Sequence, residues 1–258
     1  MFYHLFQTIR PKTLLVAFSV ILLGQLLAWH DFKSLTSQPS LNFFTSFVSL
    51  LCCLFLQIAV NLANDYFDHL SGVDGPDRKG PKRALQTGGM SLENLKLSIA
   101  GSTFLAIISG SYLIFIGGWI FLFLGLISIM GVFFYSGSSY SIASRSLGEL
   151  AVFLFFGWLG VVGSYYLQVE QFSWHLLIPA SELGFLIAAI MLVNNIRDMT
   201  TDFLAGRKTL AYRLGPTKSR ILYGTLLLLP FLLLPFNPYH PSLNAFLFPL
   251  HFALALLI

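Results

Sequence analysis

The segment that decides the fold is "LNFFTSFVSLLCCLFLQIAVNLANDYFDHL", residues 41–70, in which an uncharged apolar run leads directly into two aspartates. An apolar run of roughly 18 or more residues is long enough to cross the hydrocarbon core of a bilayer as a helix. Ionisable groups at membrane depth are costly and more often than not mark functional sites. The segment therefore predicts a transmembrane helix that carries a polar site at one end.

Apolar runs of the same kind recur along the 258 residues, of which 56% are hydrophobic and 10% charged. A soluble domain usually carries about 25% charged residues. The runs lack the period-two alternation of membrane β-strands. We therefore expect an all-α integral membrane protein with a single domain, residues 1–258. The candidate transmembrane runs are eight, near residues 13–30, 42–63, 97–116, 119–135, 148–168, 176–195, 221–236 and 243–258.

The distribution of basic residues predicts the orientation in the membrane. Every Lys and Arg except Lys33 lies at the N-terminus or in the loops after the second, fourth and sixth of these runs. Loops rich in Lys and Arg remain in the cytoplasm. We therefore expect the N-terminus and these three loops to be cytoplasmic. The net charge is only +4 and the cations lie among acids, so no nucleic-acid partner is expected.

Polar side chains form a first station at the end of the second apolar run. Asn61, Asn64, Asp65 and Asp68 are spaced i, i+3, i+4 and i+7, so they share one face if the helix continues to Asp68. Asp74 follows in a Gly-containing turn. We define this group as the first acidic station.

A second acidic station follows the sixth run, in "VNNIRDMTTDFLAGRK", residues 193–208. Asn194, Asp198 and Asp202 are spaced i, i+4 and i+8, again as one helical stripe, and Arg197 and Lys208 surround them. Both stations are cytoplasmic in the predicted orientation. We therefore expect them to face each other across the bundle.

The two stations together favour a site for a Mg²⁺-bound diphosphate. Carboxylates on one stripe repel each other unless a cation neutralises them. Carboxylate and amide oxygens suit Mg²⁺, which completes its shell with substrate phosphates, and Arg or Lys binds the remaining phosphate oxygens. Two alternatives are solvated loops with local ion pairs and an ion-coupled membrane transporter. The acids of a transporter more often lie in mid-span, whereas those of the two stations lie at the ends of runs. Glu182 lies inside the sixth run but toward its outer end, where we expect a snorkelling or hydrogen-bonded side chain.

Four blocks of sequence resemble the UbiA superfamily of intramembrane aromatic prenyltransferases. They are "RPKTL" at 10–14, "NDYFDHLSGVDGPDRKGPKRALQTG" at 64–88, "YSGSSYSIASRSLGELAVFLFFG" at 135–157 and "NNIRDMTTDFLAGRKTLAYRLG" at 194–215. The superfamily's first motif, NDxxDxxxD, matches up to Asp68; its last position is Gly72, and Asp74 follows two residues later, as in the dihydroxynaphthoate branch. The second motif, DxxxD, falls on Asp198 and Asp202.

The resemblance implies a fold and a reaction. The fold is a bundle of nine transmembrane helices around a central cavity, so we expect a ninth helix to be missing after the apolar "HFALALLI" at 251–258. The reaction is transfer of a polyprenyl group from polyprenyl diphosphate to 1,4-dihydroxy-2-naphthoate with loss of CO₂, which gives demethylmenaquinone. The alternative acceptor is another aromatic acid such as 4-hydroxybenzoate. The expected location is the bacterial inner membrane, with the lipid bilayer as a further partner.

The resemblance also implies roles for individual residues. Mg²⁺ would be held by Asn64, Asp65, Asp68, Asn194, Asp198 and Asp202. The charge on the departing diphosphate would be stabilised by Lys82, Arg83, Arg145, Arg197 and Lys208. The substrates would be contacted by Arg10, Asn61, Tyr66, Asp74, Tyr135, Tyr140 and Asn195. Within this last group, the tyrosines could stabilise an allylic cation through their ring faces.

Overall fold

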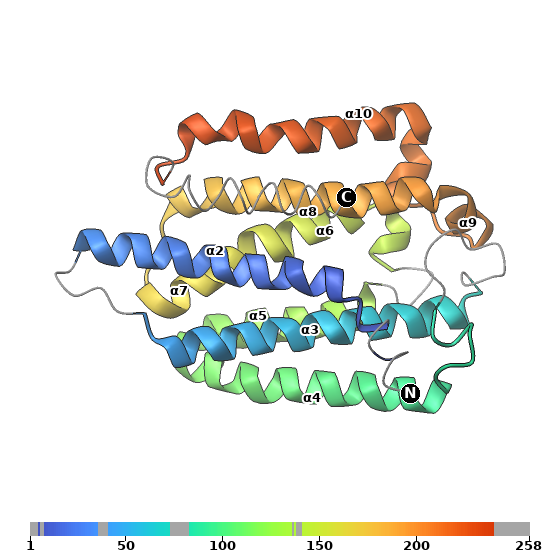
Figure 1. Ribbon diagram of the computed structural model, residues 1–258, viewed down its shortest axis with the longest axis horizontal. Helices are drawn as coiled ribbons and strands as arrows, with labels where there is room; N and C mark the ends of the chain where they lie inside the picture. The colour runs from blue at the N-terminus through green and yellow to red at the C-terminus, as the bar shows by residue number, and fades with distance from the viewer. Residues whose placement is uncertain are drawn as a thin grey trace.

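The computed structural model describes residues 5, 8–35, 41–72, 83–135, 137 and 141–239, without the side chains of 33–35. Long helices lie alongside one another, as Figure 1 shows, and no strand occurs among the described residues. The first four helices are α2 (Pro11–Leu35), α3 (Phe43–Leu70), α4 (Leu92–Gly117) and α5 (Trp119–Phe134). The second half contains η1 (Ala143–Arg145), α6 (Gly148–Val152), η2 (Phe153–Val162), α7 (Gly163–Val169), η3 (Trp174–Leu176), α8 (Leu177–Arg197), α9 (Met199–Leu204), α10 (Leu210–Leu233) and η4 (Leu234–Phe236).

Six of the described helical segments are long and apolar enough to cross a membrane, and α5 is a shorter apolar helix. These seven segments correspond to the first seven runs expected from the sequence. The eighth run, 243–258, lies outside the described residues. Large apolar side chains such as Leu97, Phe104 and Ile108 point outward from α4. Apolar surface of this extent is typical of helices that face lipid.

Helix ends follow local sequence signals. Asn42 accepts a hydrogen bond from the Thr45 amide at 3.0 Å and so caps α3, while Ser91 caps α4 through the Asn94 amide at 3.1 Å. Gly118 separates α4 from α5 with a φ of 73°. A residue with a side chain rarely adopts that conformation. The glycine therefore permits the abrupt reversal between these two neighbouring helices.

The segment α6–η2–α7 is one continuous membrane-length element, Gly148–Val169, whose middle part is a π-helix. It packs against α8 at Gly157, where an added Cβ would lie 2.8 Å from the backbone oxygen of Ala180. Val20 and Leu23 of α2 meet Leu183 of α8 in the same buried cluster. This packing fixes one wall of the bundle around its centre.

Both acidic stations lie at the same end of the bundle. The C-terminal end of α3 and the short helix α9 are at the right in Figure 1. The start of α2 approaches them there, because Arg10 contacts Asp65. The expected meeting of the two stations is therefore confirmed by the fold.

Candidate functional site

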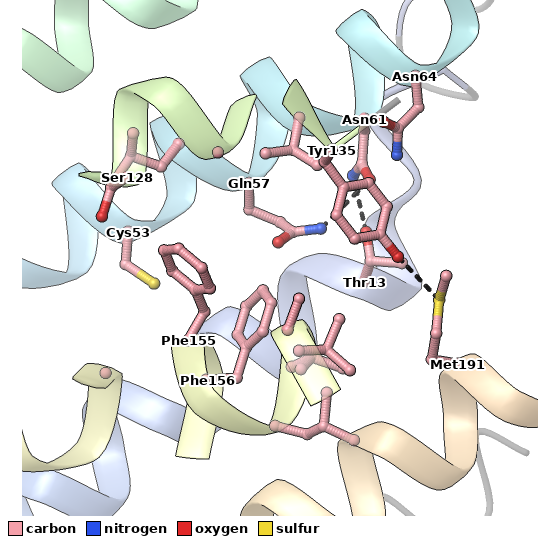
Figure 2. Close-up of a pocket in the computed structure, with 18 of the residues that line it drawn as sticks. Thr13, Cys53, Gln57, Asn61, Asn64, Ser128, Tyr135, Phe155, Phe156 and Met191 are labelled. Atoms are coloured by element: carbon pink, nitrogen blue, oxygen red, sulfur yellow. Dashed lines mark hydrogen bonds between the residues drawn. The ribbon is translucent and has the colours of Figure 1, made fainter. Parts of the chain in front are cut away.

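A cavity of about 880 Å³ opens inside the bundle between α2, α3, α5, the π-helix η2 and α8. At the end with the acidic stations its wall is charged. Farther in, the wall is mostly apolar and includes Leu113, Phe121, Leu124, Phe155 and Leu167. Figure 2 shows the transition, with Phe155 and Phe156 on one side and Asn61, Asn64 and Tyr135 on the other. The cavity thus combines an ionic end with a long apolar compartment.

The first station lies on one buried face of α3. The helix runs unbroken to Leu70, so the predicted spacing places Asn61, Asp65 and Asp68 together, with exposed fractions of 2%, 2% and 5%. Asn64 also lines the cavity. Burial of two carboxylates on adjacent turns is costly unless cations pair with them.

Arginines from two different segments provide those cations. Arg10 Nη2 lies 2.5 Å from Asp65 Oδ1. Arg83 pairs with Asp65 as well, and its Nη2 lies 3.3 Å from Asp68 Oδ2. Arg10 and Arg83 also line the cavity. They are therefore placed to contact an anion that enters it.

Asn61 holds the start of α2 in place. Its Nδ2 donates to the backbone oxygen of Ile9 and to Thr13 Oγ1, both at 2.8 Å; the contact with Thr13 is dashed in Figure 2. Thr13 in turn donates through its backbone amide and its hydroxyl to the oxygen of Arg10, each at 2.9 Å. Asn61 therefore stabilises the turn at the start of α2 that places Arg10 next to Asp65.

The second station is not one continuous helical stripe, as the sequence had suggested. Helix α8 ends at Arg197, and Asp198 caps it with φ −94° and ψ 6° before α9 begins. The Arg197 guanidinium donates two hydrogen bonds to the Asp198 carboxylate, from Nε to Oδ1 at 2.8 Å and from Nη2 to Oδ2 at 2.6 Å. The expected stripe is therefore wrong beyond Asp198, although Asn194, Asp198 and Asp202 all line the cavity.

Arg207 joins the two stations and was missed from the sequence. It pairs with Asp68, and its Nη1 lies 4.0 Å from Asp202 Oδ1. The turn after α9 places it, since Gly206 has a φ of 77° and the Arg207 amide donates to the Asp202 oxygen at 2.8 Å. Helical spacing offers no signal for Arg207, because a residue five positions after Asp202 would lie about 140° around a helix from it.

Three expected site residues do not line the cavity. Lys208 is not part of the cavity wall. Its backbone oxygen accepts a hydrogen bond from Ser146 Oγ at 2.6 Å. Arg145 lies on η1, away from the wall. Tyr66 is rotated by about 100° from Asp65 on the helix, and it packs against Phe67 with Lys96 Nζ 5.7 Å from its ring centre. Asp74, Lys82 and Tyr140 lie outside the described residues.

Tyr135 and Asn195 form part of the wall beside the ionic end. The Tyr135 hydroxyl donates to Met191 Sδ at 3.4 Å, dashed in Figure 2. Asn195 Nδ2 donates to Glu149 Oε1 at 2.9 Å. Glu149 lies in the membrane-length segment Gly148–Val169 and was not among the site residues expected from the sequence.

Glu182 lies outside the cavity wall. Its side chain is fully buried, and Asn237 Nδ2 donates to its Oε2 at 2.9 Å. The hydrogen-bonded alternative for Glu182 is thereby confirmed, and the snorkelling alternative is wrong.

The composition of the ionic end fits a divalent cation that arrives with a diphosphate. Among the described residues, no three His, Cys, Asp or Glu side chains are grouped tightly enough to hold a metal by themselves. The charged side chains that line the cavity are Arg10, Lys12, Asp65, Asp68, Arg83, Arg197, Asp198, Asp202 and Arg207. Their charges nearly balance, so a diphosphate would leave several negative charges uncompensated. Oxygen donors on opposite walls are suited to Mg²⁺, which takes its remaining ligands from phosphate and water.

Comparison with known proteins identifies relatives over most of the chain. A family model described as the UbiA prenyltransferase family matches residues 11–258. The 1,4-dihydroxy-2-naphthoate octaprenyltransferase of Escherichia coli (strain K12) is 36% identical over 231 residues, which cover 86% of this chain and 72% of that protein. The enzyme of the same name from Haemophilus influenzae is 36% identical over 227 residues, with the same coverage of 86% and 72%.

A solved structure has the same fold. The UbiA homolog from Archaeoglobus fulgidus bound to GPP and Mg²⁺ superimposes with a TM-score of 0.65 over 97% of this chain and 86% of that one, at 16% identity. The apolar helices and the matched family make this chain an integral membrane protein. The family match and the prenyltransferase relatives show an enzyme rather than a transporter. The chain belongs to the UbiA prenyltransferase family.

Proposed function

We propose that this protein transfers a polyprenyl group from polyprenyl diphosphate to 1,4-dihydroxy-2-naphthoate with loss of CO₂, giving demethylmenaquinone in its quinol form. The acceptor is the one in the names of the two relatives given above. The observation that carries the proposal is the bridge between Asp68 and Asp202 through Arg207, at the ionic end of an otherwise largely apolar cavity. We further propose that residues 1–258 act as one prenyltransferase domain.

The ionic end would bind the diphosphate. Arg10, Arg83 and Arg207 line the cavity and each contacts an aspartate of the first station. When the diphosphate enters with Mg²⁺, some N–H groups of these guanidiniums can donate hydrogen bonds to phosphate oxygens instead of to the aspartates. Mg²⁺ supplies charge neutralisation of the leaving group. Its ligands would come from Asn64, Asp65, Asp68, Asn194, Asp198 and Asp202.

The prenyl tail would lie in the apolar compartment. Ser49 and Asp68, both on α3, line opposite ends of the cavity, and a helix rise of 1.5 Å per residue separates them by about 28 Å. Burial of the isoprenoid chain along this wall stabilises the complex through the hydrophobic effect. The same wall excludes bulk water from the allylic carbon.

Group transfer then breaks one bond and forms another. The allylic C–O bond breaks, and diphosphate leaves with the bonding electrons while Arg83, Arg197 and Arg207 stabilise its growing charge. The ring carbon that carries the carboxylate forms the new C–C bond. The carboxylate leaves as CO₂ and returns its electron pair to the ring. The exchange needs no external oxidant.

We propose that the ionic end faces the cytoplasm of a bacterium and that the bundle lies in its inner membrane. The two relatives given above are bacterial. Four arginines gather at the ionic end, where each contacts an aspartate: Arg10, Arg83, Arg197 and Arg207. The positive-inside rule places such an arginine-rich end on the cytoplasmic side. Polyprenyl diphosphate and the naphthoate, both anionic, would then enter from that side.

Quinone analysis of a deletion strain tests the proposed function. A strain lacking this protein is expected to contain no menaquinone or demethylmenaquinone and to accumulate 1,4-dihydroxy-2-naphthoate. Reintroduction of the gene should restore both quinones. A deletion strain with normal naphthoquinones but depleted ubiquinone would instead favour 4-hydroxybenzoate as the acceptor.

A further inference from the structure

A buried carboxylate lies directly behind the cavity wall, next to Asn195. Glu149 is on α6 and only 5% exposed. Its Oε1 accepts from Asn195 Nδ2 at 2.9 Å, and its Oε2 is buried without a hydrogen-bond partner among the described residues. An incompletely satisfied carboxylate is costly at this depth. A purely structural role does not account for it, because an apolar side chain of similar volume would avoid that cost.

The carboxylate determines which way the Asn195 amide points. Because the Asn195 Nδ2 donates to a carboxylate oxygen of Glu149, the NH₂ group of Asn195 faces Glu149. The amide oxygen, Oδ1, is consequently turned away from Glu149. Asn195 lines the cavity, and its Oδ1 accepts no hydrogen bond from the residues that the structure describes. The wall therefore presents a fixed hydrogen-bond acceptor at this point.

Neighbouring residues shape a small corner around this oxygen. Asn195 and Met191 lie one turn apart on α8, and the Tyr135 hydroxyl donates to the Met191 sulfur. Gly148, which precedes Glu149, makes room for both: an added Cβ would lie 3.3 Å from the Tyr135 oxygen and 3.6 Å from Met191 Cε. The corner is lined by the ring of Tyr135, the thioether of Met191 and the amide of Asn195. These groups suit a hydroxylated aromatic ring.

We propose that Asn195 Oδ1 accepts a hydrogen bond from a hydroxyl of the aromatic acceptor, and that Glu149 is the positioning residue that holds the amide in this orientation. The inference rests on the proposed function and assigns a subsite within the same cavity. The hydroxyl bonded here donates electron density to the ring more strongly, because each bond in the chain from hydroxyl to amide to carboxylate polarises the next. The subsite therefore favours a hydroxyl group of the substrate, which can donate a hydrogen bond to Asn195 Oδ1. It disfavours the carboxylate of the substrate, because that group is repelled by the amide oxygen.

The variant Glu149→Gln tests the orientation. A glutamine offers either oxygen or NH₂ to Asn195, so the amide is no longer fixed. We expect the KM for 1,4-dihydroxy-2-naphthoate to rise about tenfold, the equivalent of one hydrogen bond, with the KM for polyprenyl diphosphate unchanged. The matched control is Glu182→Gln, which also neutralises a buried glutamate but does so outside the cavity wall. It should leave both KM values unchanged.

A second variant and a substrate analogue separate positioning from folding. In Glu149→Gln/Asn195→Asp, the glutamine NH₂ can donate to one aspartate oxygen and leave the other facing the cavity. This double variant should recover part of the lost affinity for the naphthoate. Asn195→Asp alone should bind the naphthoate more weakly than either Glu149→Gln or the double variant, because the new carboxylate then faces that of Glu149. The wild type should bind one of the two monomethyl ethers of the naphthoate more weakly than the other. Asn195→Ala should remove that difference.

The outcomes distinguish this inference from the proposed function. If the wild type transfers no prenyl group to the naphthoate, both are overturned. If the wild type is active but Glu149→Gln leaves the acceptor KM unchanged, or raises both KM values equally, only the positioning role is overturned. Selective loss of acceptor affinity, with partial recovery in the double variant, supports it.

Discussion

The guanidinium of Arg207 pairs with Asp68, a residue 139 positions away in the sequence. Because Arg207 also lies 4.0 Å from Asp202, it connects the end of α3 to α9 and thereby joins the two halves of the ionic site. A single cation between two carboxylates reduces their repulsion and keeps both at the mouth of the cavity.

Removal of Arg207 should therefore impair catalysis severely. For Arg207→Ala we expect a loss of kcat/KM on the order of a hundredfold, the usual cost of one donor that stabilises a leaving group. Arg207→Lys keeps the charge but not the forked geometry, and should recover only part of the activity. The measurement is prenyl transfer in membranes at saturating Mg²⁺. The control is Arg213→Ala, which replaces an exposed arginine outside the cavity wall and should change the rate less than twofold.

Neutralisation of either acidic station should abolish Mg²⁺-dependent transfer. Asp68→Asn and Asp198→Asn each preserve side-chain size but remove a charged oxygen ligand. We expect a loss of about a hundredfold or more, together with a higher Mg²⁺ requirement for the residual activity. Glu93→Gln, at an exposed position on α4, is the control. Undiminished transfer by a variant with both aspartates replaced would refute the metal assignment.

The orientation can be measured with single cysteines. In a background with Cys52 and Cys53 replaced, cysteines at Ser71 and Ala205 should react with an impermeant thiol reagent only after the inner face of the membrane is opened. A cysteine at Glu170, exposed after α7, should react in intact cells. Labelling of Ser71 or Ala205 positions from outside would reverse the proposed orientation.

The length of the apolar compartment should limit the prenyl chain. Gly125 on α5 lines the cavity, and an added Cβ there would meet no atom within 4 Å. A phenyl group at this position would occupy space proposed for the tail. We therefore expect Gly125→Phe to reduce transfer of an octaprenyl group about tenfold or more relative to a geranyl group, since the steric loss affects only the longer chain.

A matched control for the tail experiment is Gly101→Phe. Gly101 lies on α4, is exposed, and also has no atom within 4 Å of an added Cβ. It does not line the cavity, so this substitution should leave the ratio of octaprenyl to geranyl transfer unchanged. The same ratio of octaprenyl to geranyl transfer in the wild type, Gly125→Phe and Gly101→Phe would show that the prenyl tail does not lie against α5.

The parts of the site that the sequence predicted depend on regular helix geometry. A spacing of i, i+4 and i+7 fixes Asn61, Asp65 and Asp68 on one face as soon as α3 continues to Leu70. The long apolar runs likewise predicted the bundle, because few structures other than helices satisfy backbone hydrogen bonds within lipid.

The parts that were missed depend on irregular backbone or on contacts between distant helices. The turn at Gly206 after α9 places Arg207, rather than the adjacent Lys208, next to Asp68. The pairing of Glu149 with Asn195 joins α6 to α8 and leaves no local pattern in the sequence. Tyr66 was misplaced for a simpler reason, because the residue next to Asp65 on a helix faces another direction.

The most direct test of the central claim is an assay of the purified protein with both candidate acceptors present. The protein is given Mg²⁺, a polyprenyl diphosphate, 4-hydroxybenzoate and 1,4-dihydroxy-2-naphthoate labelled in its carboxyl group. We predict release of labelled CO₂ in equal amount to a prenylated naphthoquinol, with no product from 4-hydroxybenzoate. Prenylated 4-hydroxybenzoate as the sole product, without release of labelled CO₂, would contradict the proposed function.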